Sequence, residues 1–237
     1  MAEGLDGGNA DGEAVHRRTL PSPYMPSISE IRQHKTTHLP YRSWCDECVE
    51  AFAREWPHLQ HDGPSDRRIP VIHMDYAALT EKGLVKLSEL DEEARRHAVT
   101  VIVVYCSGSG SPFMHVVEAK GTTRDKFSAE RVVEDIVFLG HSRVILRSDN
   151  EPALLQLVGD ALKGLRVQQL DSAASEGSTP HDPQTAGSAE VAVRNLKCQV
   201  RAMHLTLDRF LEKHVPVTHP LIAWLVEHAA FVRFTSV

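Results

Sequence analysis

The chain has 237 residues, 42% of them hydrophobic and 24% charged, which gives room for one full domain with a core and some appended segments. Its longest apolar runs, such as 98–106, are too short to span a bilayer, and the N-terminus lacks the apolar core of a signal peptide, so we expect an intracellular protein with no membrane partner. The formal net charge of −6 disfavours a broadly basic surface, so any contact with DNA must depend on local charge and specific chemistry.

Residues 1–27 carry Gly, Asp, Glu, Ser and Pro with almost no apolar periodicity, which predicts a disordered acidic leader. In the next segment, 28–62, the stretch HKTTHLPYRSWCDEC contains two histidines and two cysteines. Two thiolates and two imidazoles are the ligands that structural zinc favours. The histidines also have i, i+4 spacing, which would bring both rings onto one helical face. We therefore predict a small zinc-binding module whose Zn²⁺ ligands are His34, His38, Cys45 and Cys48.

Two alternatives stay open for this segment. His58 and His61 follow the cysteines, so the ligand set could be Cys45, Cys48, His58 and His61. The two cysteines could also be buried thiols in a reducing compartment, with no metal bound.

From residue 71 onward, strand-like and helix-like blocks alternate. The order of strands and helices predicts an α/β fold, in which helices flank a mixed sheet. The β-branched run at 99–104 is typical of a strand buried on both faces, and Gly164 is expected to end a helix. The predicted strands are 71–79, 98–106, 113–119, 143–148 and 165–170, and the predicted helices are 125–140, 151–164, 185–213 and 219–232.

Three carboxylates lie where such a sheet would place chemistry: Asp75 within the first strand, Asp149 directly after the fourth, and Glu190 near the start of the long helix. A buried aspartate in a strand is costly unless a charge compensates it, and a divalent metal ion is one such charge. Two Mg²⁺ ions held about 4 Å apart by carboxylates support phosphoryl transfer. Asp149 alone could instead be a helix N-cap, and Glu190 alone a solvated helix carboxylate. Together, the three acids favour a metal site.

The long helix also carries a basic stripe. Arg194, Lys197 and Arg201 follow Glu190 at steps of four, three and four residues, which places them along one side of the helix. The stripe predicts contacts with DNA phosphates. Such a pattern more often indicates a basic helix edge that is simply exposed to solvent. The position of this stripe beside Glu190 favours DNA binding instead.

Several of these motifs resemble a known family. DYAAL from residue 75, RSDNEP from residue 147 and PHDPQTAGSAE from residue 180 resemble the three acidic motifs of retroelement integrases, which use a DDE triad on a ribonuclease-H-like fold. The stretch HLPYRSWCDECV, followed by Pro57 and His58, resembles the zinc-binding module in Pol polyproteins of copia-like LTR retrotransposons. The resemblance covers roughly residues 21–235.

The resemblance implies a DNA integrase with a catalytic core at 70–213. In such an enzyme Asp75, Asp149 and Glu190 would hold two Mg²⁺ or Mn²⁺ ions while water trims a DNA 3′ end, and the freed 3′-hydroxyl would then attack target DNA. The implied partners are DNA, further copies of the chain and other parts of the Pol polyprotein, in the nucleus and the cytoplasm. We expect 214–237 to form a C-terminal helix that is truncated, as in a fragment or a degenerate copy.

Two other functions are compatible with the same residues. One is a catalytically decayed element that binds DNA or assembles without turnover. The other is a different ribonuclease-H-like nuclease or a DNA transposase that uses the same acids. The zinc-binding module in front of the core favours a retroelement integrase over the second of these.

Overall fold

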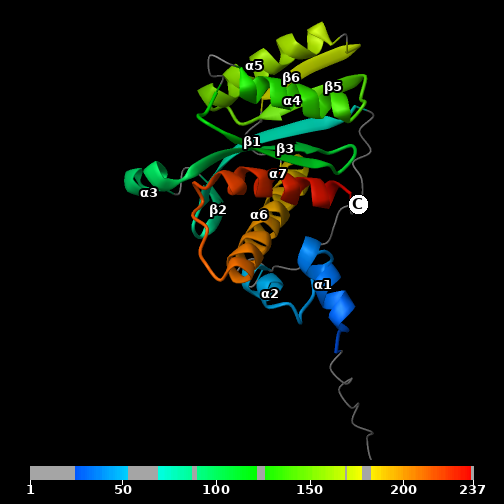
Figure 1. Ribbon diagram of the computed structural model, residues 1–237. Coiled ribbons are helices and arrows are strands. Elements are labelled where there is room, and N and C mark those ends of the chain that lie inside the picture. Colours follow the sequence, from blue (N-terminus) through cyan, green and yellow to red (C-terminus); the bar gives the residue numbers. More distant parts are fainter. Residues whose placement is uncertain are drawn as a thin grey trace, which may run out of the picture.

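A mixed six-stranded sheet forms the centre of the computed structural model (Figure 1). The structure describes residues 25–52, 69–86, 90–121, 126–168, 170–177 and 183–235, with side chains for all of these except 177 and 183–190. Most of the predicted leader, and both His58 and His61 of the alternative zinc set, lie outside these residues. The strands are β1 (Val71–Thr80), β2 (Gly83–Lys86), β3 (Val99–Cys106), β4 (Pro112–Val117), β5 (Arg143–Ser148) and β6 (Ser172–Gly177).

The strand order is β4-β3-β1-β5-β6, with β2 paired to β1 beside this path. β1 pairs antiparallel with β2 and β3, and β3 pairs antiparallel with β4. β5 is parallel to β1, and β6 is parallel to β5. The sheet is therefore mixed, as predicted, and it agrees with the ribonuclease-H-like arrangement that the resemblance implies. Residues 101–104 of β3 are all buried, which confirms the prediction of a strand covered on both faces.

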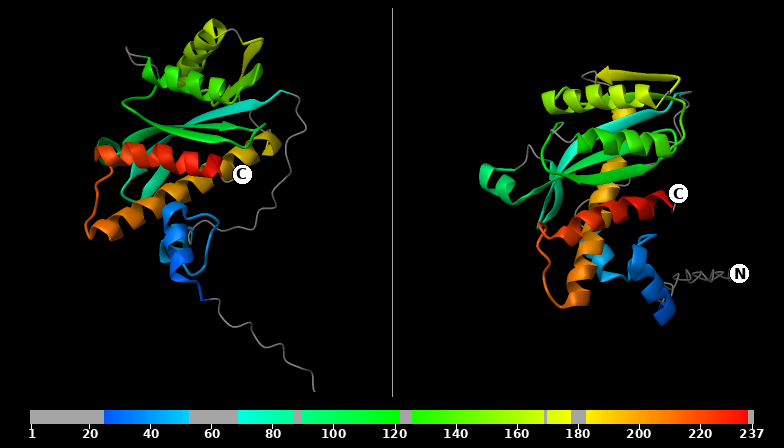
Figure 2. Two further views of the ribbon diagram at one scale, coloured as in Figure 1. Left: turned by 45° about the vertical axis from the view of Figure 1, so that its right-hand side comes forward. Right: turned by 45° about the horizontal axis from the view of Figure 1, so that its top comes forward.

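Helices cover both faces of this sheet (Figures 1 and 2). One face carries two helices that follow β4 and β5, and the other carries the two helices that end the chain. Two short N-terminal helices pack beside the long one, away from the sheet. The helices are α1 (Ile28–Thr37), α2 (Asp46–Phe52), α3 (Glu92–His97), α4 (Phe127–Phe138), α5 (Pro152–Val167), α6 (Pro183–Leu211) and α7 (Pro220–Phe234).

Alternation along β1 separates two hydrophobic cores. Ile72, Met74 and Tyr76 face the core formed with α4 and α5, whereas Ala77 and Leu79 belong to the core formed with α6 and α7. Successive side chains of a strand point to opposite faces, so one strand supplies both cores. The sheet is thereby held between two helical layers, and α7 shares its core with α6.

The predicted strand at 165–170 is wrong. Residues up to Val167 belong to α5, because Leu165 continues the buried side of that helix one turn after Ala161. Gly164 does not end the helix, which continues to Val167. A Cβ at this position would lie 2.8 Å from Val133 Cγ2, so the glycine allows α5 to pack closely on α4. The fifth strand of the order is β6, which has the sequence SAASEG and lies at the sheet edge.

The region between the first two predicted strands contains two elements that the sequence did not predict. β1 turns through Glu81 and Lys82 into β2, and Gly83 takes a left-handed φ of 106° at the end of the turn. α3 follows, with Asp91 as its N-cap. Among the helices of the described residues, none has the length and apolar character needed to cross a membrane.

Candidate functional site

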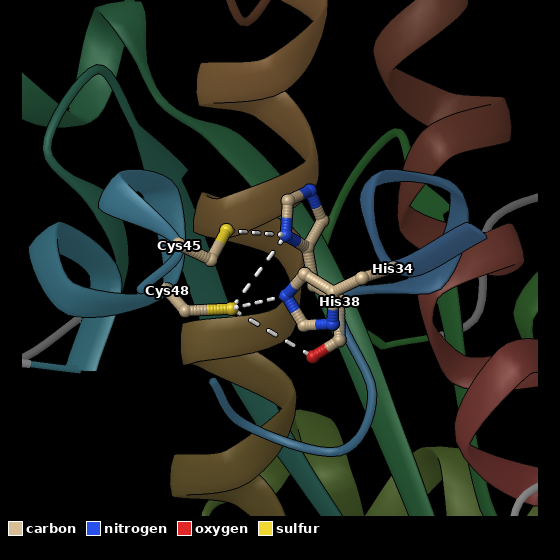
Figure 3. A group of neighbouring side chains, drawn as sticks. All are labelled: His34, His38, Cys45 and Cys48. Carbon is tan, nitrogen blue, oxygen red and sulfur yellow. Dashed lines mark hydrogen bonds between the residues drawn. The ribbon is translucent and has the colours of Figure 1, made fainter. Parts of the chain in front are cut away.

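The structure brings His34, His38, Cys45 and Cys48 together in one buried cluster (Figure 3). A capping box at Ser27 starts α1, which carries His34. His38 is not on the helix itself, because it is the C-cap and takes a left-handed φ of 55°. Cys45 directly precedes α2 and Cys48 lies in its first turn. Two helix ends therefore supply all four ligands.

The spacing of the ligand atoms fits a tetrahedral zinc ion. One potential ligand atom from each residue lies within 4.8 Å of all the others. His34 Nε2 is 3.3 Å from Cys48 Sγ, and His38 Nδ1 is 3.5 Å from Cys45 Sγ and 3.6 Å from Cys48 Sγ. Usual zinc–sulfur and zinc–nitrogen bond lengths at a tetrahedral angle give a sulfur–nitrogen separation of about 3.5 Å. This His₂Cys₂ group could therefore hold zinc.

Burial controls the protonation of these four groups. It lowers the pKa of His38 to about 4, with help from the neighbouring His34, and it lowers the pKa of His34 as well. Both imidazoles are therefore neutral near pH 7, which is the form that binds metal. Burial raises the pKa of Cys45 to about 12 and also raises that of Cys48. Zinc binding must consequently displace a proton from each thiol.

The cluster is connected directly to the long helix α6. With Nδ1 turned to the metal position, His38 Nε2 carries the proton and donates to Thr206 Oγ1 at 2.6 Å. The Gln199 side chain donates from Nε2 to the carbonyl oxygen of Thr37. The buried carboxylate of Glu47 lies 3.0 Å from Arg209 Nη1. These contacts join residues about 160 positions apart in sequence, so no local pattern could have predicted them.

Replacing Thr206 with valine is expected to weaken zinc binding by about 10–100-fold, the usual cost of losing an outer partner of a metal-bound histidine. Competition with a chromophoric chelator measures this affinity. Thr36→Val is the matched control, because Thr36 is exposed on α1 and donates to the carbonyl oxygen of Arg32. Equal zinc affinity in wild type and the Thr206 variant would contradict the role given to this hydroxyl.

Asp75 and Asp149 each come directly after a paired residue of two parallel strands. The register of β1 and β5 pairs His73 with Arg147 and Met74 with Ser148. The next residue is Asp75 within β1, and Asp149 directly after the end of β5. Parallel neighbours lie about 4.8 Å apart. Met74 faces the α4–α5 core, so strand alternation directs Asp75 to the opposite face, which is the face that carries α6. The binding of one cation by both carboxylates stays a prediction.

Two expectations about these aspartates need correction. The side chain of Asp75 is exposed rather than buried, although its neighbours Met74 and Tyr76 are buried in the core on the other face. The cost of burial therefore does not argue for a metal there. The N-cap interpretation of Asp149 is also wrong, since the N-cap of α5 is Glu151 and Pro152 starts the helix. Asp149 is thus a strand-end carboxylate without a capping role.

Two ion pairs involve residues close to Asp149 in sequence. Lys120 Nζ lies 2.5 Å from Glu151 Oε1, which connects the end of the β4 region to the residue that caps α5. Arg147 Nη2 lies 2.6 Å from Glu176 Oε2, which connects β5 to β6. The two pairs involve side chains two residues before and two residues after Asp149. The sequence motifs contain Arg147 and Glu151 but gave no indication of their partners.

Glu190 lies in α6, which crosses the face of the sheet opposite α4 and α5 (Figure 2). Its side chain is outside the described ones, so its meeting with the two aspartates stays a prediction. Arg194 and Lys197 are partly exposed on the same helix. Arg201 Nη2 lies 3.9 Å from Glu50 Oε1 of the zinc module. The predicted basic stripe is thus in part a docking contact for α2.

No family model and no curated protein matches the sequence. Among solved structures, the chain is similar to a chain in the cryo-EM structure of a simian T-cell lymphotropic virus intasome in complex with the PP2A regulatory subunit B56 gamma, at 15% identity and a TM-score of 0.43. The match covers 74% of this chain and 53% of that chain, so this chain spans about half the length of the one it matches. A likeness at this level carries no functional argument.

Proposed function

We propose that the chain is a metal-dependent polynucleotidyl transferase of the integrase type, which trims DNA 3′ ends and joins them to target DNA. The observation that carries this proposal is the register of β1 and β5, which pairs Met74 with Ser148, the residues directly before Asp75 and Asp149. Alternation from Met74 places Asp75 on the face that α6 crosses, and α6 contains Glu190. Asp149 is proposed to face the same side. Three carboxylates on these elements form a DDE arrangement.

Carboxylate oxygens are the ligands that Mg²⁺ and Mn²⁺ prefer, so Asp75, Asp149 and Glu190 are the residues that would hold the catalytic ions. Two such ions, when bound, supply charge stabilisation for the attacking and leaving oxygens of a phosphodiester. The protein's part is to fix the two aspartates by the strand register and to bring the glutamate from α6. Solvent exposure of both aspartates leaves room for a DNA end.

The zinc module has a structural role in this proposal. Residues 28–62 form the module and residues 70–213 the catalytic core, with 214–237 adding a helix to it. The contacts of His38 and Glu47 with α6 support a module that holds this helix in place. On the same helix, Arg194 and Lys197 are proposed to contact DNA phosphates, and Arg201 would join them only by giving up its long contact with Glu50.

The wider setting follows from the motifs that resemble copia-like elements. The proposed partners are the DNA ends of an element, its target DNA, further copies of the chain and other parts of a Pol polyprotein. The chain is proposed to be synthesised in the cytoplasm and to act on DNA in the nucleus. Sequencing the DNA downstream of the coding region tests whether the chain is encoded by a copia-like element. In such an element the reverse transcriptase is encoded downstream of the integrase.

A strand-transfer assay tests the enzymatic activity. The purified chain is incubated with a labelled duplex oligonucleotide and a plasmid target, in the presence of Mg²⁺ or Mn²⁺. We expect joined product that requires the metal ion and that Glu190→Gln abolishes. Glu130→Gln is the control, since Glu130 is an exposed carboxylate on α4, on the other side of the sheet. Absence of product, or full activity of the Glu190 variant, would refute the catalytic role.

A further inference from the structure

A second group of metal-ligand side chains lies at the opposite end of α6 from Glu190. His204 and Asp208 are four residues apart on the helix, and His214 follows in the turn toward α7. A potential ligand atom from each of these three residues lies within 4.8 Å of the other two. These three residues belong neither to the His₂Cys₂ cluster nor to the proposed catalytic acids.

The hydrogen bonds around the group hold each side chain in position. His214 Nδ1 lies 2.8 Å from Asp208 Oδ2, and His214 Nε2 lies 2.9 Å from Glu81 Oε2 in the β1–β2 turn. The Val215 N–H donates to Asp208 Oδ1 at 2.8 Å. His204 Nε2 lies 2.7 Å from the Val215 carbonyl oxygen and 3.7 Å from Asp208 Oδ1. Three separate segments therefore converge on this point.

We propose that His204, Asp208 and His214 form a second transition-metal site that takes Zn²⁺, with Glu81 as the outer partner of His214. Two imidazoles and one carboxylate are a common zinc ligand set that leaves a position for water. In this arrangement His214 binds through Nδ1, and its Nε2–H donates to Glu81, which is the usual way a carboxylate orients a metal-bound histidine. The exposed position of His214 gives a metal ion access.

Metal binding changes two contacts of the group. His204 must present a lone pair at Nε2, so its hydrogen bond to the Val215 carbonyl is exchanged for the metal. The close contact of His214 with Asp208 becomes a contact of two ligands across one ion. The bound ion would then connect the β1–β2 turn, α6 and the segment leading to α7. This site is independent of the proposed catalysis, because it lies far along α6 from the predicted position of Glu190.

Zinc stoichiometry tests the proposal. The full chain, purified without a polyhistidine tag, is titrated with Zn²⁺ by calorimetry, and bound metal is counted by mass spectrometry. We expect about two zinc ions per chain, one of them in the His₂Cys₂ cluster. His214→Ala should reduce the count to one. Glu81→Gln, an exposed change in a turn, should keep the fold and weaken the second site by about 10–100-fold.

Two control variants and a cobalt spectrum distinguish metal binding at this site from metal binding elsewhere in the chain. His97→Ala and Glu118→Gln alter exposed side chains elsewhere and should leave two zinc ions bound. With Co²⁺ as the probe, the second equivalent should add ligand-field bands without further thiolate-to-metal charge transfer, because the site has no cysteine. Saturation of wild type at one zinc ion, or unchanged binding in both the His214 and Glu81 variants, would overturn the proposal.

Discussion

Replacing Cys48 with serine is expected to unfold the N-terminal module and to leave the sheet folded. Within residues 28–52, the buried apolar side chains are Cys45, Cys48 and Ala51, so this described part of the module has almost no hydrophobic core of its own. Small modules of this kind depend on the metal, because structural zinc contributes about 10–16 kcal/mol of apparent binding free energy to folding. Serine is a much poorer zinc ligand than cysteine, so most of that contribution is lost.

Hydrogen exchange measures the effect. Amides of α1 and α2 should lose protection in Cys48→Ser, while amides of β1 and β3 keep theirs. Removing zinc from wild type with a chelator should reproduce the pattern. Cys198→Ala is the control, since Cys198 is a buried cysteine of α6 outside the cluster. Protected α1 and α2 amides in zinc-free protein would show that the module folds without metal.

The same experiment examines α6. His38, Thr37 and Glu47 each contact α6, so unfolding of the module removes partners of Thr206, Gln199 and Arg209. Exchange of α6 amides around these residues should increase as well. The increase should be smaller than in α1, because Leu196, Val200 and Met203 keep the helix packed on the sheet. Zinc would in this way support the helix that carries Glu190.

Features that depend on short sequence separations were predictable. The zinc ligands lie within fifteen residues of one another, and the ligand types alone indicate the site. The long β-branched run of β3 indicates a buried strand, and Pro152 marks the first turn of α5. In each case the residues that carry the signal are neighbours in the chain.

Features that depend on distant partners were not predictable. β6 consists of small and polar residues, and it is a strand because β5 offers it backbone hydrogen bonds rather than because of its side chains. The exposure of Asp75 depends on how far the helices cover the sheet. The apolar pattern of the residues around Asp75 gives no information on that coverage. Thr206 has no motif, and only the fold brings it to His38. The role of the three acids therefore stays a prediction, and the sequence misjudged the surroundings of Asp75.

Asp75→Asn and Asp149→Asn are each expected to reduce the strand-transfer rate by at least about a thousandfold. Stabilisation of transition-state charge by bound metal ions amounts to several kcal/mol, and each 1.36 kcal/mol changes the rate tenfold. An amide in place of either carboxylate removes a negative charge that the cations need. Because the register pairs the residues directly before the two aspartates, we expect Asp75 and Asp149 to bind a shared ion. The rate loss in the double variant should therefore be little larger than in either single variant.

Single-turnover strand transfer at saturating Mn²⁺ measures these rates, and calorimetric titration with Mn²⁺ measures the loss of binding directly. Both aspartates are exposed, so the variants should fold like wild type, and the zinc content and melting temperature should be unchanged. Glu118→Gln is the matched control, because it removes an exposed carboxylate just after β4. Independent, multiplying losses in the double variant would show that Asp75 and Asp149 do not share an ion. The shared-ion interpretation of the β1–β5 register would then fail, even if each residue alone were essential.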